Sequence, residues 1–334
     1  MQGPRFISVI VPVFNGAQCL RQCLGALAES SYQHYEVIVV DDCSTDNTAE
    51  IGGAARVSVL QTARRSGPAS ARNLGVQHAR GDIVLFVDAD VVVRPDTLAR
   101  VAAQFEMNPN LAAVFGSYDD DPSAKNFISQ YKNLFHHFVH QRSNPEATTF
   151  WAGCGAVDRK VFLEVGGFDA RRYDKPSIED IELGYRIRRQ GYRILLDKAL
   201  QAKHLKEWRL ASLLRADILC RAIPWTNLML ERRENTNDLN LKTSDRISGV
   251  LVALLIPTVL AALLWQAFFY LIGVILAVII ILNATLYRYL LRRKGPFFTL
   301  RAFFMHILYY FYSGTTFVLC SCWYLVFGSN RTVH

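Results

Sequence analysis

This 334-residue chain lacks internal repeats and a regular cysteine framework. Its seven cysteines are an odd number and include no CxxC pair, so we expect reduced thiols packed as small apolar groups instead of a disulfide framework. No long apolar run follows Met1, so a secretory signal peptide is not expected. No low-complexity tract interrupts the sequence either.

Charge is absent from two long stretches near the carboxyl end. Residues 247–287 carry no charged side chain, and residues 302–330 lack Asp, Glu, Lys and Arg. One membrane-spanning helix takes about 20 residues, so we expect spans at about 248–265, 267–287 and 305–327. Five basic residues lie between the second and third of these: Arg288, Arg292, Arg293, Lys294 and Arg301. The positive-inside rule then predicts an integral membrane protein whose amino-terminal domain is cytosolic.

The first 205 residues have the pattern of an α/β domain. Apolar runs at 6–13, 35–40 and 83–87 alternate with segments of helical periodicity, and the connections are short. This alternation predicts a mostly parallel sheet flanked by helices. We therefore divide the chain into a cytosolic domain (1–205), an amphipathic interface segment (206–246) and a transmembrane region (247–330).

Acidic residues follow two of the predicted strands. Asp41 and Asp42 end the second apolar run, and Asp88 and Asp90 end the run at 83–87. Ligands bind outside the carboxyl ends of strands in open α/β sheets. Carboxylate oxygens there suit Mn²⁺ or Mg²⁺, which share their coordination shell with substrate phosphates.

Four motifs in register resemble the family-two glycosyltransferases of GT-A fold. They are the stretches from Ser8 to Asn15, from Val39 to Asp46, from Ala71 to Gly75 and from Asp88 to Asp90. The similarity extends from residue 6 to about 205, with one departure at Cys43, where the family usually has glycine. It implies an inverting, metal-dependent transfer from a nucleotide-sugar donor, with UDP favoured.

The resemblance also assigns roles to individual residues. Asp90, Asp88 and His204 are the expected metal ligands. Asp180 is the expected catalytic base, and Glu179 completes the acidic pair of the catalytic site. The expected donor-binding residues in this domain are Pro12, Phe14, Asn15, Asp42, Arg72, Asn73 and Asp88.

A glycine-rich segment, 149–156, is expected to be a strand on the acceptor side. Glycine inside a strand often marks close approach of a ligand to the backbone. We expect Trp151, Gly153 and Cys154 to contact the acceptor, although burial of the Trp151 ring in the core explains the same residue equally well.

Two further clusters have simpler explanations. Asp119, Asp120 and Asp121 stand before Pro122 and are expected in a solvated loop. His136 and His140 lie one helical turn apart, but no glutamate accompanies them as in a zinc HExxH motif, so an ordinary helix face is expected.

Residues 208–233 mix leucines and isoleucines with arginines, as an interfacial helix does. The segment from Arg221 to Trp225 is loosely similar to the Arg/Trp motif of processive synthases, with Arg221 expected near the diphosphate and Trp225 near the acceptor. Because Pro224 interrupts this motif, processivity is not inferred. The alternative explanation is that Arg221 and Trp225 anchor the helix at the membrane interface.

These patterns favour a membrane-bound glycosyltransferase that acts on a hydroxyl of a lipid-linked saccharide or a surface polysaccharide. The expected partners are the donor, that acceptor and membrane lipid. Membrane assembly partners are left open, and no nucleic-acid partner is expected. A polyprenyl-phosphate sugar synthase and a catalytically silent nucleotide-binding scaffold remain as alternatives. A channel is disfavoured, because the predicted spans carry no charge.

Overall fold

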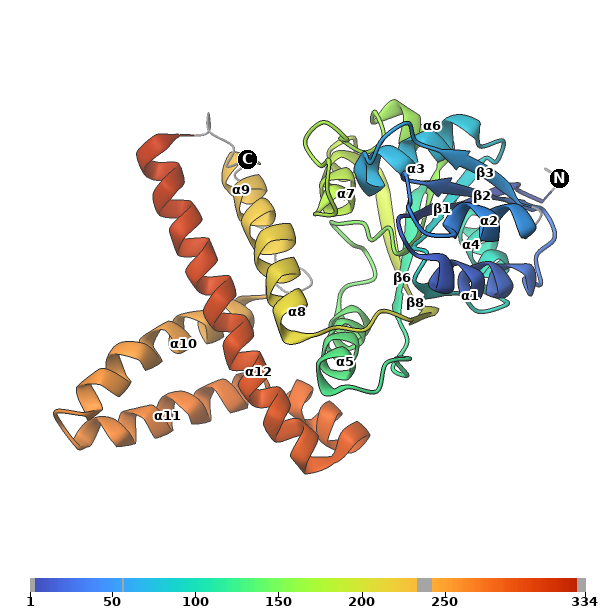
Figure 1. Cartoon of the computed structure of the whole chain (residues 1–334). Helices are drawn as coiled ribbons and strands as arrows, with labels where there is room; N and C mark the ends of the chain where they lie inside the picture. Colours follow the sequence, from blue (N-terminus) through green and yellow to red (C-terminus); the bar gives the residue numbers. More distant parts are fainter. Residues whose placement is uncertain (1–3, 56, 233–241, 329–334) are drawn as a thin grey trace. The chain divides into compact units, whose positions relative to one another are not determined.

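The computed structural model describes residues 4–55, 57–232 and 242–328. The chain forms two compact units, residues 1–207 and 208–334. The amino-terminal unit contains an eight-stranded sheet with helices on both faces, and the carboxyl-terminal unit is helical (Figure 1).

The sheet has the strand order β3-β2-β1-β4-β7-β6-β8-β5. Strands β1 (Ile7–Val13), β2 (Tyr35–Asp41), β3 (Ser58–Gln61) and β4 (Ile83–Val87) are parallel, as expected from the alternating pattern. Strand β7 (Cys154–Asp158) is antiparallel to both β4 and β6 (Leu111–Tyr118). Strand β8 (Arg193–His204) is parallel to β6, and β5 (Val91–Val92) pairs with its end in the antiparallel direction.

Helices cover both faces of the sheet, and nearly every residue of its central strands β1, β4, β7 and β6 is buried. Helices α1 (Ala17–Ala28) and α4 (Thr97–Met107) contribute their leucines, valines and Phe105 to one face. Helix α3 (Gly67–His78) packs on the other face, where Gly75 approaches Ile10 too closely for a larger residue. Phe86 of β4 faces this same side and contacts Phe162 of α6 (Arg159–Glu164). The unit also contains α2 (Thr48–Ala54), α5 (Phe127–Arg142) and α7 (Glu179–Arg189).

The glycine-rich segment is shorter as a strand than the sequence indicated. Residues 149–153 are outside the sheet and β7 begins only at Cys154. A Cβ atom on Gly153 would lie 2.4 Å from the Trp151 ring, so the chain folds back on itself here. The expected strand over residues 149–153 is therefore replaced by a turn that carries Trp151.

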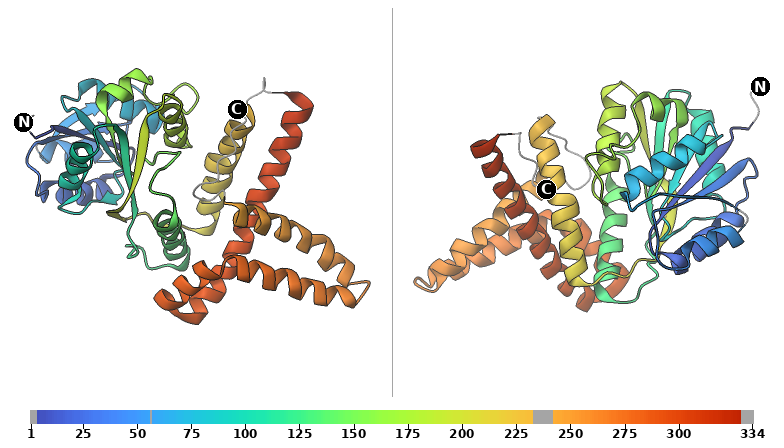
Figure 2. Two further views of the ribbon diagram at one scale, coloured as in Figure 1. Left: turned by 180° about the vertical axis from the view of Figure 1, so that it is seen from behind. Right: turned by 45° about the horizontal axis from the view of Figure 1, so that its top comes forward.

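The carboxyl-terminal unit contains α8 (Leu210–Asp217), a π-helical turn η1 (Ile218–Ala222), α9 (Ile223–Arg232), α10 (Thr243–Ala262), α11 (Ala267–Leu282) and α12 (Ala284–Phe327). Helices α10 and α11 form a hairpin that α12 contacts, with Val252, Ile275, Ile279 and Tyr310 in the shared apolar core (Figure 2). Gly295, with φ 82°, breaks the helical geometry inside α12.

Among the described residues, two helices are long and apolar enough to cross a membrane: α10 and α12. The turn between α10 and α11 lies at 263–266, where the charge-free stretch was expected to turn. Helix α11 is apolar but has only 16 residues, or about 24 Å at 1.5 Å per residue, against about 30 Å of bilayer core. Three full spans therefore remain a prediction.

Candidate active site

Strand pairing brings Asp90 and His204 together, although 114 positions separate them in the chain. Val91 of β5 lies opposite His204 of β8, so Asp90 adjoins the end of β8. The Nε2 atom of His204 is 3.7 Å from an Asp90 carboxylate oxygen. Burial alone would raise the pKa of Asp90, but the hydrogen bond and the charge of His204 hold it below its usual value. Asp90 is thus kept ionised, as a cation ligand must be.

A buried arginine joins the end of β4 to the start of α7. Arg72 of α3 donates one hydrogen bond to Asp88 at 2.7 Å and another to Glu179 at 2.8 Å. Burial would lower the pKa of this guanidinium, but the two carboxylates raise it above its usual value. Burial raises the pKa of Asp88, an effect that the charge of Arg72 opposes. Arg72 and Glu179 thus form a buried ion pair beside Asp88.

Asp180 is anchored at the first turn of α7. One carboxylate oxygen accepts the Ala152 N–H at 3.1 Å, and the other accepts the Ile181 N–H at 2.8 Å. Burial, aided by the negative charge of Glu179, raises the pKa of Asp180 to about 6. A carboxyl group with this pKa can both accept and release a proton near neutral pH.

The loops after β1 and β2 hold each other in place. Asn15 accepts a hydrogen bond from the Thr45 N–H at 2.8 Å and donates its own N–H to Ser44. The Asp42 carboxylate accepts three hydrogen bonds: from the Thr62 hydroxyl and from the N–H groups of Ser66 and Gly67.

Pro12 and Phe14 belong to the same edge of the sheet. Pro12 is within β1, and Phe14 follows the strand with 36% of its surface exposed. The guanidinium carbon of Arg65 lies 4.0 Å above the Phe14 ring. Arg65 therefore covers one face of the Phe14 ring at the strand end where a donor base was expected.

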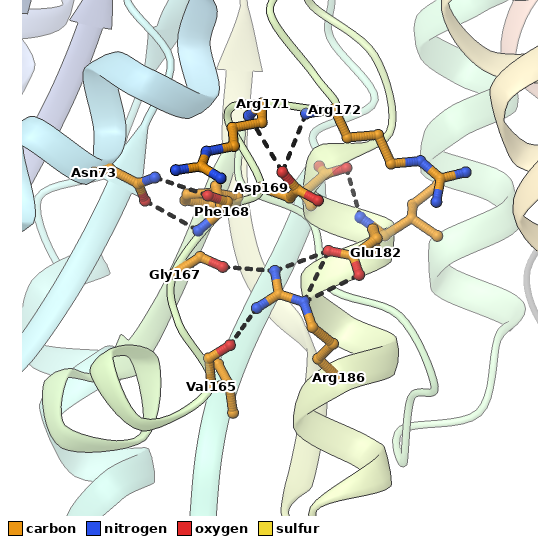
Figure 3. A network of polar contacts seen from close by, with 11 residues as sticks. Asn73, Val165, Gly167, Phe168, Asp169, Arg171, Arg172, Glu182 and Arg186 are labelled. Atoms are coloured by element: carbon orange, nitrogen blue, oxygen red, sulfur yellow. Dashed lines mark hydrogen bonds and ion pairs between the residues drawn. The ribbon is translucent and has the colours of Figure 1, made fainter. Parts of the chain in front are cut away.

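Asn73 fixes the loop that follows α6. Its amide donates to the Phe168 carbonyl at 2.8 Å and accepts the Phe168 N–H at 3.0 Å, as Figure 3 shows. The side chain is thus engaged by protein backbone in this structure. Its expected donor-binding role stays a prediction.

A second set of contacts ties the same loop to α7. Arg186 forms an ion pair with Glu182, one turn away on the helix, and donates to the carbonyls of Val165 and Gly167 (Figure 3). Asp169 accepts the N–H groups of Arg171 and Arg172. Helix α7, which carries Asp180, is therefore held by both α3 and the 165–169 loop.

The expected acceptor residues of this unit surround the turn before β7. Asp88 N–H donates to the Gly153 carbonyl at 3.1 Å, next to the Ala152 N–H that binds Asp180. Residues 152–153 therefore contact both acidic motifs. Trp151 is half-buried, with its ring edge-on to Tyr118 at 4.8 Å between centroids. Cys154 is fully buried in the apolar core, so its thiol faces protein.

Arg221 and Trp225 lie in the carboxyl-terminal unit. Arg221, in η1, donates to Asp217 at 2.7 Å, and Tyr312 of α12 donates to the other Asp217 oxygen. Trp225 is in the first turn of α9. Their expected contacts with donor and acceptor stay predictions.

The side chains of Asp88, Asp90 and His204 suit a divalent cation that takes its other ligands from substrate phosphates and water. Within the described ranges, no three His, Cys, Asp or Glu side chains form a metal-binding group. Asp90 and His204 are adjacent, and the side chains of Asp88 and Asp90 are about a third exposed. Mg²⁺ is commonly held by one or two carboxylates together with substrate phosphates and water. These residues therefore fit such an ion.

Three residues near the site were not singled out from the sequence. Arg65, Tyr118 and Arg186 act through contacts with residues 51, 86 and 21 positions away, respectively. The Asp119–Asp121 stretch is a loop, as expected, and Lys203 pairs with Asp121 there. His136 and His140 do lie on one helix, but their rings also contact Trp151. No local pattern in the sequence marks these long-range contacts.

Residues 8–166 match the family model described as "Glycosyl transferase family 2". The chain is 34% identical over 126 residues to the glycosyltransferase GlyG of Streptococcus pneumoniae, covering 36% of this chain and 42% of that protein. It is 40% identical over 104 residues to the poly(ribitol-phosphate) beta-N-acetylglucosaminyltransferase TarS of Staphylococcus aureus, covering 29% and 18%. The matches thus span less than half the length of these relatives.

Among solved structures, the chain resembles the mannosyltransferase PcManGT from Pyrobaculum calidifontis, determined in complex with GDP-Man and Mn²⁺. The TM-score is 0.59 at 19% identity, and the alignment covers 94% of this chain and 87% of that one. This similarity supports the GT-A fold.

Proposed function

We propose a reaction for this chain on the premise that it belongs to glycosyl transferase family 2 and has a GT-A fold. It transfers a sugar from a nucleotide-sugar to a hydroxyl of a lipid-linked saccharide or surface polysaccharide, with inversion at the anomeric carbon. UDP is the favoured nucleotide, and GDP is the second candidate because the structural neighbour PcManGT binds GDP-Man. Two relatives support a polymeric acceptor: the poly(ribitol-phosphate) beta-N-acetylglucosaminyltransferase TarS and the putative teichuronic acid biosynthesis glycosyltransferase TuaG of Bacillus subtilis.

One observation carries this proposal. Residues 152 and 153 contact Asp180 through one N–H and Asp88 through one carbonyl, so both acidic motifs are fixed to a single short turn. The register of β4 against β7, with Val87 opposite Cys154, holds that turn at the carboxyl edge of the sheet. An acceptor beside Trp151 would therefore meet a base from α7 and a donor bound at the strand ends.

Asp180 would act as the general base. It removes the proton from the acceptor hydroxyl while the hydroxyl oxygen forms a bond to the anomeric carbon. The bond from that carbon to the phosphate oxygen breaks on the opposite face, and its electron pair leaves with the nucleoside diphosphate. One displacement of this kind inverts the centre. The pKa of about 6 leaves Asp180 ionised and able to accept this proton at pH 7.

Glu179 would act on this base without touching the sugar. It is buried, binds Arg72 and accepts the Ser177 N–H, so it fixes the start of α7. Its negative charge also contributes to the raised pKa of Asp180.

Donor recognition would use the loops that end β1 and β2. Pro12 and Phe14 supply an apolar surface for the base, while Asp42, Asn15 and Asn73 shape the surrounding loops. Arg72 would hold Asp88 in place at the ribose side. Asp90, with His204 and Asp88, would hold Mn²⁺ or Mg²⁺, which offsets the charge of the leaving diphosphate when bound.

The carboxyl-terminal unit would place this reaction at a membrane. Helices α10 and α12 are long and apolar enough to span, and a basic segment, 288–301, separates the apolar part of α11 from that of α12. By the positive-inside rule that segment and the catalytic unit are cytosolic. Arg221 and Trp225 would anchor α9 and η1 near the lipid headgroups or meet the donor and acceptor.

The direct test is hydrolysis of a panel of nucleotide-sugars by the purified full chain in detergent, with Mn²⁺ or with Mg²⁺. Metal-dependent release of UDP or GDP from one donor supports the proposal and identifies the sugar. Absence of release from every donor supports the catalytically silent scaffold instead. If Asp180→Asn keeps a normal transfer rate, the acceptor is an already ionised lipid phosphate, which needs no base.

A further inference from the structure

An aromatic side chain that the proposed reaction does not use lies between the two sides of the site. Tyr118, the last residue of β6, stacks on the His204 ring with centroids 4.0 Å apart and planes 12° apart. It also meets the Trp151 ring edge-on at 4.8 Å and the His136 ring at 4.6 Å. One ring therefore contacts both an expected metal ligand and an expected acceptor residue.

The strand register explains why the Tyr118 and His204 rings meet. Tyr118 lies opposite Ala202 of β8, and His204 is two residues further on, so both side chains project from the same face. A register shift between Phe115 and Ser117 precedes this pair, where Gly116 passes too close to the Leu200 carbonyl for any side chain. Irregularities of this kind redirect side chains beside active sites.

The backbone around Tyr118 is also fixed. Its carbonyl lies 2.8 Å from Nδ1 of His137 on α5, and the next residue, Asp119, donates its N–H to the Ala202 carbonyl at 2.8 Å. These contacts fix the backbone from which the Tyr118 ring projects. Tyr118 is half-buried and packs against the apolar core, with its ring between those of His204 and Trp151.

We propose that Tyr118 is a positioning residue that holds His204 beside Asp90 and Trp151 beside the turn at residues 152–153. This inference rests on the proposed function, because it takes Asp90 and His204 as cation ligands and Trp151 as an acceptor contact. The ring, and not the hydroxyl, is the active part: stacking on His204 and edge contact with Trp151 both use the π-system. Loss of the ring should therefore disturb both sides of the site at once.

Two substitutions at the same position separate these roles. Tyr118→Phe keeps the ring and should bind Mn²⁺ in the presence of UDP within about twofold of the wild type. Tyr118→Leu removes the ring and should weaken Mn²⁺ binding about 10- to 100-fold, as loss of a residue that orients a metal ligand does. Electron paramagnetic resonance of free Mn²⁺ measures both constants on the full chain in detergent, without a turnover assay.

The second readout is the emission of Trp151, obtained by subtracting the spectrum of Trp151→Phe. Tyr118→Leu should shift this emission to longer wavelength, because the indole loses its aromatic neighbour and gains water. Tyr118→Phe should leave it unchanged. Tyr192→Leu is the matched control: Tyr192 is half-buried, precedes the opposite end of β8 and donates its hydroxyl to Glu164. It should alter neither readout.

Equal Mn²⁺ affinity in Tyr118→Leu and wild type, or an unshifted Trp151 emission, would overturn the inference. If Tyr118→Leu does not fold, Tyr118→Phe decides: a loss of Mn²⁺ affinity well beyond twofold, or a shifted Trp151 emission, would show that the hydroxyl is needed and would overturn the inference. Failure of the wild type to bind Mn²⁺ with either UDP or GDP refutes the proposed function instead.

Discussion

Asp180 and Ala152 are joined by a hydrogen bond of 3.1 Å from the Ala152 N–H to the Asp180 carboxylate. The contact spans 28 positions and fixes the proposed base to the turn that also binds Asp88. An asparagine can accept the Ala152 hydrogen bond through its amide oxygen and gives up the Ile181 hydrogen bond, so the base can be removed while its link to this turn is kept. Residue 180 is therefore the most direct position at which to test the proposed general base.

We predict that Asp180→Asn lowers sugar transfer about 10²- to 10⁴-fold, the usual contribution of a general base. Donor binding, measured by calorimetry, should stay within about twofold. The melting temperature at pH 7 should not fall, because burial and Glu179 disfavour the ionised carboxylate that is removed. Asp174→Asn, an exposed aspartate before α7, is the matched control and should transfer at the wild-type rate. Near-normal turnover by Asp180→Asn would end this assignment.

The same carboxylate should set the pH dependence of the wild type. Burial raises its pKa to about 6, so Asp180 is protonated and unable to accept a proton below that pH. We expect the transfer rate at saturating donor to fall about tenfold per pH unit below 6 and to level off above about 7. A rate that stays constant from pH 5 to pH 8 would contradict a base with this pKa.

Replacing Arg72 should lower the free energy of unfolding far more than replacing a surface arginine. Arg72→Met leaves the buried Glu179 and the neighbouring Asp88 without their cation, a loss that typically costs about 3–5 kcal/mol. Arg80 also pairs with a carboxylate, Glu36, but its side chain is 76% exposed. Arg80→Met should cost at most about 1 kcal/mol. Chemical denaturation of both full-length variants measures how much unfolding free energy each has lost. Equal losses would refute the claim that burial makes the Arg72 ion pairs more important.

The strand-end acids could be predicted from the sequence because their signals are local. Five apolar residues before Asp88, and another run before Asp41, indicate strands by themselves. The alternation of strands and helices then places both ends on one edge of the sheet. The family motifs added roles to these positions.

The contacts that assemble the site could not be predicted in this way. Arg72 reaches Glu179 across 107 positions, and Asp90 meets His204 only because β5 pairs with β8. The stack of Tyr118 on His204 depends on a register shift after Phe115. The turn at residues 152–153 depends on the bulk of the Trp151 ring beside Gly153. Each of these is set by tertiary packing and leaves no periodic pattern.

Divalent cations should bind through Asp90. Removal of metal with EDTA should abolish transfer, and Mn²⁺ or Mg²⁺ should restore it. Asp90→Ala should lose metal-dependent donor binding, because it removes the carboxylate beside His204 and leaves Asp88, which already binds Arg72, as the remaining proposed oxygen ligand. Asp96→Ala removes an exposed aspartate that forms an ion pair with Arg100 one helical turn away, and it should retain donor binding. Metal-dependent donor binding that survives in Asp90→Ala would contradict the assignment.

The membrane proposal predicts how the chain behaves on fractionation. Spanning helices α10 and α12 should keep it in the membrane pellet after a wash with alkaline carbonate, and detergent should release it. A wash with 1 M salt, which screens arginine contacts with lipid headgroups to about 3 Å, should release nothing. Release by salt alone would indicate a protein that lies on the surface.

Gly153→Ala should separate acceptor use from donor use. An added Cβ would meet the Trp151 ring at 2.4 Å, so the indole must move away from the turn that binds Asp180 and Asp88. We expect transfer to an acceptor to fall at least about tenfold while metal-dependent donor hydrolysis continues, because Asp90 and His204 are not displaced. Gly25→Ala, in α1 with open space around its Cβ, is the matched control and should stabilise that helix by about 0.5–1 kcal/mol without changing either rate. Transfer that stays at the wild-type rate in Gly153→Ala would contradict an acceptor role for Trp151.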